Sequence, residues 1–266
     1  MLSIGVDIGG TKVAAGVVSR TGEVVERLTV PSPTSTPESV ENAIVEVVRE
    51  LRSRHHVSSV GIGAAGWVDS EQALVRFSPH LAWRNEPLRD RLRSRIDIPV
   101  IVDNDANAAA GAEYRFGAGR GAGVMVCITL GTGIGGALVV DGRVFRGTYG
   151  MAGEWGHMTV LPDGHRCACG NRGCWEQYAS GNALVREANS LIDSGSPQAA
   201  GLAAVAGPDG ISGPAVTALA LAGDRPSVEL LGEVGTWLGK GMANLAAALD
   251  PELFVIGGGV SEAGGL

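Results

Sequence analysis

The sequence lacks the features that would direct it to a membrane or to a nucleic acid. Its apolar runs stay well short of the length that spans a bilayer, and no basic, apolar leader with small residues precedes Ile4. Basic residues do not predominate, since the formal net charge is −7, so the composition does not favour a polyanionic partner. We therefore expect a soluble cytosolic protein that binds neither membranes nor nucleic acids.

Cysteine is also scarce, with four in 266 residues, but three of the four lie close together. They are Cys167, Cys169 and Cys174, with His157 ten residues before the first and Glu176 two residues after the last. Structural zinc favours four nitrogen or sulfur ligands, which three thiolates and one imidazole supply. A disulfide is the weaker alternative, because one cysteine would stay unpaired and a ring across Cys-Ala-Cys would be strained. The spacing predicts a zinc site beside a carboxylate.

Glycine is abundant instead, with 41 residues, which indicates many positions where the chain turns tightly or approaches a ligand closely. Two glycine clusters fall at the bends of predicted β-hairpins. The first hairpin spans residues 2–18 around IGGTK, and the second spans residues 124–140 around GTGIGG. Two similar hairpins indicate two related α/β halves.

The remaining elements follow from periodicity and capping signals. One apolar face predicts a helix over residues 40–51, with Thr36-Pro37-Glu38 as its start signal. Further strands are expected at 60–64, 100–103 and 253–259, and further helices at 105–114, 181–192 and 228–249. Residues 194–227 predict a connector with one short helix. We expect an α/β protein with a smaller domain over residues 1–103 and a larger one over residues 104–266.

The string GTGIGG matches the dinucleotide-binding fingerprint, but its context does not. That fingerprint needs a helix after the glycines, whereas here a strand and a turn follow. The P-loop pattern also fails, because Lys12 lacks the required glycine spacing. Two bends whose amides meet phosphate oxygens from opposite sides of a cleft remain the favoured interpretation, with Asp7 and Lys12 flanking the first bend. The alternative is a pair of tight turns without a chemical role.

Seven motifs together resemble a known family. They are DIGGTK at 7–12, GAAGWVD at 63–69, VDNDANAAA at 102–110, LGTGIGG at 130–136, GEWGH at 153–157, CACGNRGCWE at 167–176 and VIGGGV at 255–260. The sequence resembles bacterial sugar kinases of the ROK family, within the actin and hexokinase-like ATPase superfamily. The cysteine segment and NDANAAA are the specific motifs, whereas DIGGTK alone would indicate only the superfamily. The resemblance implies two related α/β domains, an active-site cleft between them, and a homo-oligomer, either a dimer or a tetramer.

The resemblance also implies a set of sugar-site residues. They are Gly66, Asn104, Asp105, Glu154, His157 and Glu176. Asp105 would be the catalytic base that accepts the sugar hydroxyl proton, although Asn104 or Asp105 could instead only cap a helix. One ring nitrogen of His157 would bind zinc and the other a sugar hydroxyl. The alternative for Glu154 and Glu176 is that they are solvated surface residues without a role in binding.

On the nucleotide side, the resemblance implies ATP with Mg²⁺, which Asp7 would hold through water. The residues implied for the phosphates are Gly9, Gly10, Thr11, Lys12, Gly131, Thr132 and Gly133, and those for adenosine are Gly257, Gly258 and Gly259. An ordinary turn after a strand is the alternative for the last three. Kinases of the family normally continue for several tens of residues past GGGV, so we expect either a longer chain than the one ending at Leu266 or an incomplete nucleotide site.

The implied activity is that of an ATP-dependent glucokinase, which phosphorylates the 6-hydroxyl of D-glucose. Glu154, His157 and Glu176 suit a ring with free hydroxyls, whereas an N-acetyl group would need an apolar recess. The alternatives are a kinase for fructose, mannose or N-acetylmannosamine, and a glucokinase that uses polyphosphate. A sugar-responsive repressor is less favoured, because it carries a basic DNA-binding segment before the first sheet, whereas here the first strand is expected from residue 2 and the charge is negative.

Overall fold

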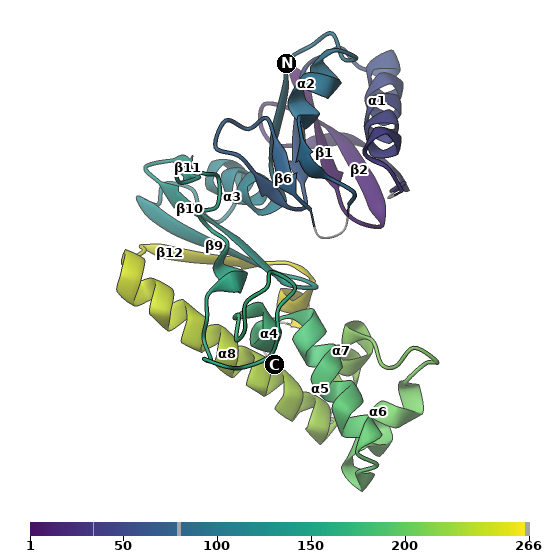
Figure 1. Cartoon of the computed structure of the whole chain (residues 1–266), viewed down its shortest axis with the longest axis vertical. Coiled ribbons are helices and arrows are strands. Elements are labelled where there is room, and N and C mark those ends of the chain that lie inside the picture. Colours follow the sequence, from purple (N-terminus) through teal and green to yellow (C-terminus); the bar gives the residue numbers. More distant parts are fainter. Residues whose placement is uncertain (34, 79–80, 264–266) are drawn as a thin grey trace. The chain divides into compact units, whose positions relative to one another are not determined.

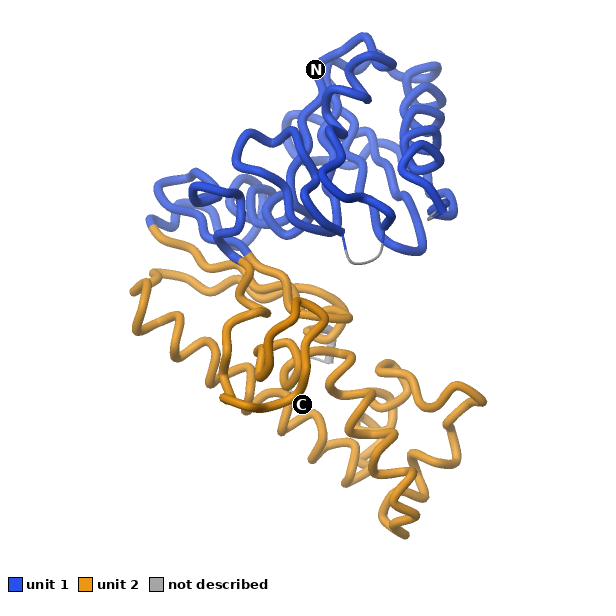
Figure 2. The backbone as a smooth tube through the Cα atoms, in the orientation of Figure 1, with its two compact units in different colours: residues 1–123, 137–153 blue, residues 124–136, 154–266 orange. Residues whose placement is uncertain are grey.

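The structure, a computed structural model, describes residues 1–33, 35–78 and 81–263 (Figure 1). It forms two compact units, unit 1 with residues 1–123 and 137–153, and unit 2 with residues 124–136 and 154–266 (Figure 2). The division therefore differs from the boundary expected after residue 103. Helix α3 (Asp105–Phe116) belongs to unit 1 because it packs against strands of that unit.

A five-stranded mixed sheet forms the centre of unit 1, in the order β3-β2-β1-β4-β8. Its strands are β1 (Leu2–Ile8), β2 (Lys12–Val18), β3 (Val24–Pro31), β4 (Val57–Ala64) and β8 (Val100–Asn104). Strands β1, β4 and β8 run parallel, and their last residues pair as Ile8 with Ala64 and Ala64 with Asn104. The carboxyl ends of the three strands therefore share one sheet edge, where side chains from separate motifs meet.

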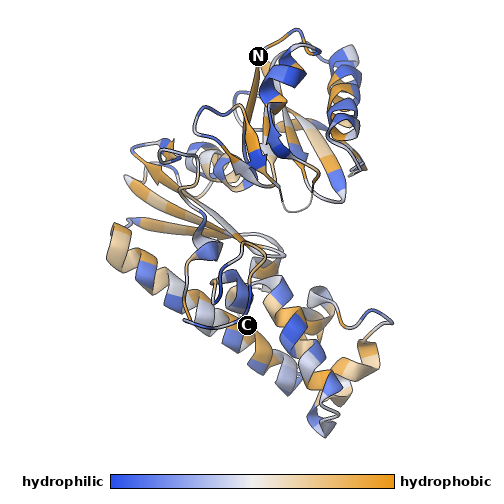
Figure 3. Ribbon diagram, in the orientation of Figure 1, coloured by the Kyte–Doolittle hydropathy of each residue, from blue (hydrophilic) through white to orange (hydrophobic). Residues whose placement is uncertain are grey.

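Helix α1 (Pro37–Arg54) covers this sheet with the apolar face that the sequence predicts. Its buried residues include Val40, Ile44, Val48 and Leu51, and Figure 3 shows hydrophilic and hydrophobic residues alternating along the helix. Thr36 begins the helix with a capping box, which satisfies amide groups that have no partner within the first turn. The predicted helix and its start signal are both confirmed.

Short elements complete unit 1. They are the three-stranded sheet β5 (Trp67–Val68), β6 (Val75–Phe77) and β7 (Arg84–Glu86), helix α2 (Leu88–Arg93), and β11 (Arg143–Phe145), which pairs antiparallel with the end of β10 (Ile134–Val140). None of the short elements has enough residues to show a period in the sequence. Strand β3 was also not predicted.

Unit 2 combines two parallel strands with a helical layer. Strand β9 (Val124–Leu130) pairs with β12 (Leu253–Gly257). The helical elements are η1 (Trp155–His157), α4 (Glu176–Ala179), α5 (Gly181–Asp193), η2 (Pro197–Ala199), α6 (Ala200–Val205), α7 (Gly213–Leu221), α8 (Arg225–Leu249) and η3 (Gly259–Ala263). Leu184, Leu202, Val216 and Leu231 form part of the core among α5, α6, α7 and α8. Among the described residues, no helix combines the length and apolar character that a membrane span requires.

The prediction of one short helix between residues 194 and 227 is wrong. That stretch contains η2, α6 and α7, and α8 already begins at Arg225. Helix α7 has a local start signal, since Ser212 accepts a hydrogen bond from the Ala215 amide and a proline follows in the first turn. The helices are rich in alanine, a strong helix former, and they accommodate some of the glycines and prolines that suggested a connector, with Gly201 inside α6 and Gly213 and Pro214 in the first turn of α7.

Candidate functional site

The sheet edge of unit 1 brings together residues from three of the motifs. Asn104 ends β8, and its Nδ2 donates to the carbonyl oxygen of Gly66, which follows β4, at 3.0 Å. The Oδ1 of Asn104 accepts from the amide of Asn107 at 3.0 Å, so Asn104 is the N-cap of α3. Gly66 is required by its backbone, because its φ is +141° and an added Cβ would lie 2.3 Å from the Phe77 carbonyl oxygen.

Asp105 is the first residue of α3 and does not cap it. Its Oδ1 accepts from the neighbouring Ala106 amide at 2.9 Å. The side chain is exposed, but the surrounding protein removes enough water to raise the pKa of the Asp105 carboxyl. The Ala106 amide opposes this rise in the pKa, and repulsion from Asp7 adds to it. A carboxylate with a raised pKa is a stronger proton acceptor than an ordinary aspartate.

The first glycine bend is closed by its own backbone. The Gly9 amide donates to the Lys12 carbonyl at 3.0 Å, and Thr11 and Lys12 are exposed at the bend. Burial raises the pKa of Asp7 near the end of β1, and the positive charge of Lys12 partly offsets the rise. The bend therefore places Lys12 beside Asp7, and Asp7 in turn lies close enough to Asp105 to repel it.

The second glycine bend, in unit 2, is held by the start of α5. The amides of Gly181 and Asn182 donate to the carbonyls of Gly131 and Thr132 at 2.8 and 3.2 Å. Thr132 stays exposed. The predicted second bend between β9 and β10 thus exists, and it is fixed by a neighbouring helix rather than by its own turn alone.

The glycine segment after β12 lies against the same region of unit 2. Gly258 has φ +99°, and an added Cβ would lie 2.3 Å from the Leu130 carbonyl oxygen at the end of β9. An added Cβ on Gly181 would lie 3.4 Å from Val260 Cγ2. The structure therefore brings the residues 131–133 and 257–259 together around the N-terminus of α5, as one binding surface for the nucleotide would require.

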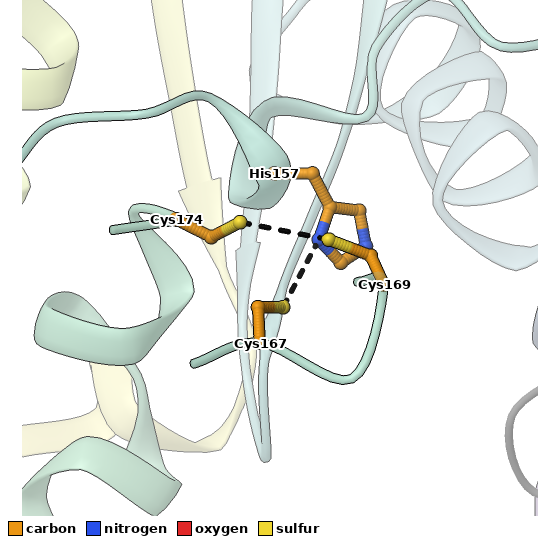
Figure 4. Close-up of side chains that lie close together, drawn as sticks. All are labelled: His157, Cys167, Cys169 and Cys174. Atoms are coloured by element: carbon orange, nitrogen blue, oxygen red, sulfur yellow. Dashed lines mark hydrogen bonds between the residues drawn. The ribbon is translucent and has the colours of Figure 1, made fainter. Parts of the chain in front are cut away.

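The three cysteines and His157 converge in unit 2 (Figure 4). Their ligand atoms all lie within 4.8 Å of one another. The Sγ of Cys167 lies 3.6 Å from the Nδ1 of His157, and the Sγ atoms of Cys169 and Cys174 also lie 3.6 Å apart. Ligands about 2.3 Å from a tetrahedral zinc ion are about 3.8 Å apart, and all the cysteines are free thiols. The donor set and its spacing fit a structural zinc ion.

Two carboxylates flank this cluster. Glu176 Oε1 accepts from the Cys167 thiol at 3.0 Å and lies 3.7 Å from His157 Nδ1, whereas Glu154 Oε2 lies 3.9 Å from His157 Nε2. The ring of His157 therefore presents Nδ1 to the cysteines and Nε2 to Glu154. Burial raises the pKa of the Cys167 thiol, and that of Cys174 to about 11, so a metal ion must displace protons when it binds.

Glu176 also connects the cysteine cluster to the second glycine bend. An added Cβ on Gly133 would lie 2.6 Å from Glu176 Oε2. One carboxylate oxygen therefore faces Cys167 and His157, and the other lies over the Gly133 backbone. A side chain at this position would displace the Glu176 carboxylate from its place.

The sequence model of the ROK family matches residues 3–266. The chain belongs to the ROK family. Its members share the fold of actin-like and hexokinase-like ATPases, in agreement with the α/β units and mixed sheets described above.

Relatives of this ROK chain include both kinases and repressors. Glucokinase of Streptomyces coelicolor is 46% identical over 267 residues, which cover 100% of this chain and 84% of that enzyme. The crystal structure of a ROK family glucokinase from Streptomyces griseus in complex with glucose and AMPPNP has a TM-score of 0.90 at 48% identity, and the match covers 99% of this chain and 85% of that one. The xylose repressor of Bacillus subtilis is 27% identical over 98% of this chain and 65% of the repressor.

One charged residue of the ROK chain at the sheet edge of unit 1 escapes sequence reasoning. Asp103, next to Asn104 in β8, is only 8% exposed and forms an ion pair with Arg146, which follows β11. The pair joins positions 43 residues apart, so no local motif reveals it. The available signal is an aspartate inside a buried strand, because a buried carboxylate requires a partner.

Proposed function

We propose that this ROK protein is an ATP-dependent glucokinase that transfers the γ-phosphate of ATP to the 6-hydroxyl of D-glucose. The main support is its 48% identity, over 99% of the chain, to a ROK family glucokinase whose structure contains glucose and AMPPNP. Further support comes from contacts within the units, where Asn104 bonds Gly66 in unit 1 and Glu176 lies beside His157 in unit 2.

Asp105 is the proposed catalytic base. Its carboxylate takes the proton of the 6-hydroxyl, the hydroxyl oxygen forms a bond to the γ-phosphorus, and the bond from that phosphorus to the bridging oxygen breaks to release ADP. The raised pKa of Asp105 supports this role, because the proton acceptor is then stronger than an ordinary carboxylate. Its position at the start of α3 keeps the ionised form favourable at neutral pH.

The proposed sugar ligands are carboxylate, imidazole and amide groups. Glu154 and Glu176 accept hydrogen bonds from sugar hydroxyls, and the Nε2 of His157, on the side of the ring away from the cysteines, bonds a further hydroxyl. Asn104 already donates to Gly66 and accepts from Asn107. A sugar hydroxyl would therefore use the second lone pair of Asn104 Oδ1 or the second N–H of its Nδ2.

The glycine segments are proposed to bind ATP. Backbone amides of residues 9–12 and 131–133, with Thr11, Lys12 and Thr132, would meet the phosphates, and residues 257–259 the adenosine. Asp7, whose carboxylate lies near Lys12, would hold Mg²⁺ through water. His157, Cys167, Cys169 and Cys174 would hold a structural zinc ion, which supplies order to the loop because four protein ligands leave no open position.

The setting of the enzyme is also a proposal. Free thiols that bind metal persist in a reducing compartment, so we expect the protein in the cytosol. Assembly as a dimer or a tetramer, catalysis in glycolysis and the absence of nucleic-acid binding remain predictions. A sugar-responsive regulator is the second candidate, because a xylose repressor is among the relatives.

Steady-state kinetics across a panel of acceptors and donors tests the proposal. The acceptors are glucose, 2-deoxyglucose, mannose, fructose and N-acetylmannosamine, each with Mg-ATP or polyphosphate. Glucose with ATP should give the highest kcat/KM and should exceed N-acetylmannosamine by at least about tenfold, because an acceptor that leaves buried polar groups unpaired is rejected. A better acceptor than glucose would contradict the glucokinase assignment, and no phosphorylation at all would favour the regulator.

A further inference from the structure

We propose that Asp103 and Arg146 act as a positioning pair for Asp105, fixing the first turn of α3 and shielding Asp105 from a second negative charge. This inference rests on the proposed function, in which Asp105 is the base. The pair lies entirely within unit 1, so its geometry does not depend on unit 2.

The carboxylate of Asp103 is fully engaged. Its Oδ2 accepts from Gln72 Nε2 at 2.9 Å and from Arg146, whose Nε is at 3.2 Å and whose Nη2 also contacts it. Its Oδ1 accepts from the amide of Asn104 at 2.9 Å and from Asn107 Nδ2 at 3.2 Å. A single buried carboxylate therefore joins a guanidinium, a side-chain amide and the beginning of α3.

These contacts involve residues on both sides of Asp105 in the sequence. Asn104 immediately precedes Asp105 and Asn107 follows it by two residues, so Asp103 holds the backbone amide before Asp105 and the side-chain amide of Asn107 after it. The base also lies directly over β4, since an added Cβ on Gly63 would be 3.6 Å from the Asp105 Cα. Loss of the Asp103 contacts would let the first turn of α3 shift, and a small displacement of a reacting group is sufficient to slow catalysis strongly.

Arg146 is well placed to neutralise Asp103. The two Arg146 nitrogens that contact the carboxylate form a fork, and the third, Nη1, donates to the Val144 carbonyl at 3.2 Å, which fixes the guanidinium. The backbone of Arg146 is held as well, because its carbonyl accepts from the Ala152 amide at 3.2 Å. Both members of the ion pair are thus held in place, Asp103 within β8 and Arg146 in the segment that follows β11.

The charged groups near Asp105 make the electrostatic role specific. Strand β1 contributes Asp7, the first glycine bend contributes Lys12, and β8 contributes Asp103. Strand β4 has no charged residue, and the position after β11 contributes Arg146, whereas Arg143 within β11 is exposed. Without Arg146, a second uncompensated carboxylate would stand two residues from Asp105 and would add to the repulsion from Asp7.

Two substitutions that remove opposite charges test the pair. Arg146→Gln leaves Asp103 unpaired, so the acidic limb of the kcat profile should move to higher pH. Asp103→Asn removes a negative charge, so the same limb should move to lower pH, and each movement should be about half a unit to one unit. Both variants should lower kcat about tenfold and leave the KM for glucose within about threefold, because the sugar ligands are unchanged.

Matched variants separate position from charge. Arg146→Lys keeps the charge but loses the fork, so it should restore the pH limb and only part of kcat. Arg143→Gln removes an exposed arginine from the same hairpin and should change neither. A loss of melting temperature in all variants with no opposite movement of the pH limb would overturn the proposal, because a merely structural pair would behave in that way.

A measurement without turnover makes the test independent of the reaction. NMR titration of the Asp105 carboxyl carbon should show the same opposite shifts in the Arg146→Gln and Asp103→Asn variants. Shifts in the same direction, or none, would overturn the pair. Failure of the proposed function looks different, since the wild-type protein would then phosphorylate none of the sugars while the titration still decides the role of Asp103 and Arg146.

Discussion

The two units hold their functional side chains by different means. In unit 1, Asn104 and Asp105 are fixed by hydrogen bonds that the chain makes with itself, through Gly66, Asn107 and the Asp103 carboxylate. In unit 2, His157 and the three cysteines face one another as the ligands of one ion would. Hydrogen bonds persist without a cofactor, whereas a cluster of thiols gains its order when metal binds. The first site should therefore be independent of metal, and the second should not.

The largest effect is expected in unit 1, from removal of the base. Asp105→Asn keeps the oxygen that accepts from the Ala106 amide, so α3 and its N-cap should remain intact. Turnover should fall at least about a hundredfold while the Kd for glucose stays within about tenfold, because general-base assistance is lost and sugar contacts remain. Initial rates and isothermal titration calorimetry measure the two quantities. Near-normal turnover would show that Asp105 is not the base.

Removal of the metal should have the opposite pattern, in which the loop of unit 2 loses its order and the chemical step is affected less. Cys169→Ser, or dialysis against a chelator, should reduce zinc from about one ion per chain and lower the melting temperature by several degrees. Hydrogen exchange should rise over residues 154–176 and stay unchanged in α3, and the KM for glucose should increase. Elemental analysis and exchange mass spectrometry provide the readout.

Cys127→Ala is the matched control for the metal experiment. Cys127 is buried in β9 and lies outside the cluster, so its removal should leave the zinc content unchanged. Full activity and an unchanged melting temperature in metal-free wild-type protein would contradict a structural role for the cluster. If metal removal increased hydrogen exchange in α3 as much as over residues 154–176, the two units would not differ in their dependence on metal.

The stability of unit 2 apart from its metal can be tested with two glycines of α8. An added Cβ on Gly241 would lie 2.0 Å from Cε2 of Trp175, the residue that precedes α4. Gly241→Ala should therefore destabilise the protein by about 1–3 kcal/mol through overpacking. Gly239, two residues earlier, has open space around the added Cβ. Gly239→Ala should therefore stabilise by about 0.5–1 kcal/mol through helix propensity. Thermal unfolding in excess zinc compares them, and equal effects would contradict the packing of α8 against Trp175.

The smallest expected effect concerns the electrostatics of unit 1. Folding raises the pKa of Asp105. Asp105 therefore contributes favourably to the free energy of unfolding at pH values below its unfolded pKa, and this contribution is lost as the pH rises through its folded pKa. The melting temperature of Asp105→Asn relative to wild type should therefore increase between pH 4 and pH 7. Asp97 has the opposite sign, since a hydrogen bond from Arg52 lowers its pKa, and Asp97→Asn should become relatively less stable as the pH rises toward the ordinary aspartate pKa of about 3.9. A common slope would contradict the assignment.

Local signals in the sequence predicted the elements that position the site. The glycine bends, the α1 face and the Asn104 cap all depend on residues a few positions apart, so their patterns are visible in the chain. The cysteine spacing predicted a cluster that the structure brings within 4.8 Å. The ion pair of Asp103 with Arg146 and the contact of Glu176 with Gly133 were not predictable, because each depends on packing between elements distant in sequence.

The order in which the chain completes its units has a consequence for synthesis on the ribosome. Unit 1 needs residues 137–153, but residues 124–136 of unit 2 are made first. A nascent chain that has reached residue 123 already contains β8 and Asp103, yet the arginine that neutralises this carboxylate has still to be translated. Buried charge without a partner opposes folding. Unit 1 should therefore mature only after the hairpin of β10 and β11 has emerged, and a fragment ending at residue 123 should fold poorly.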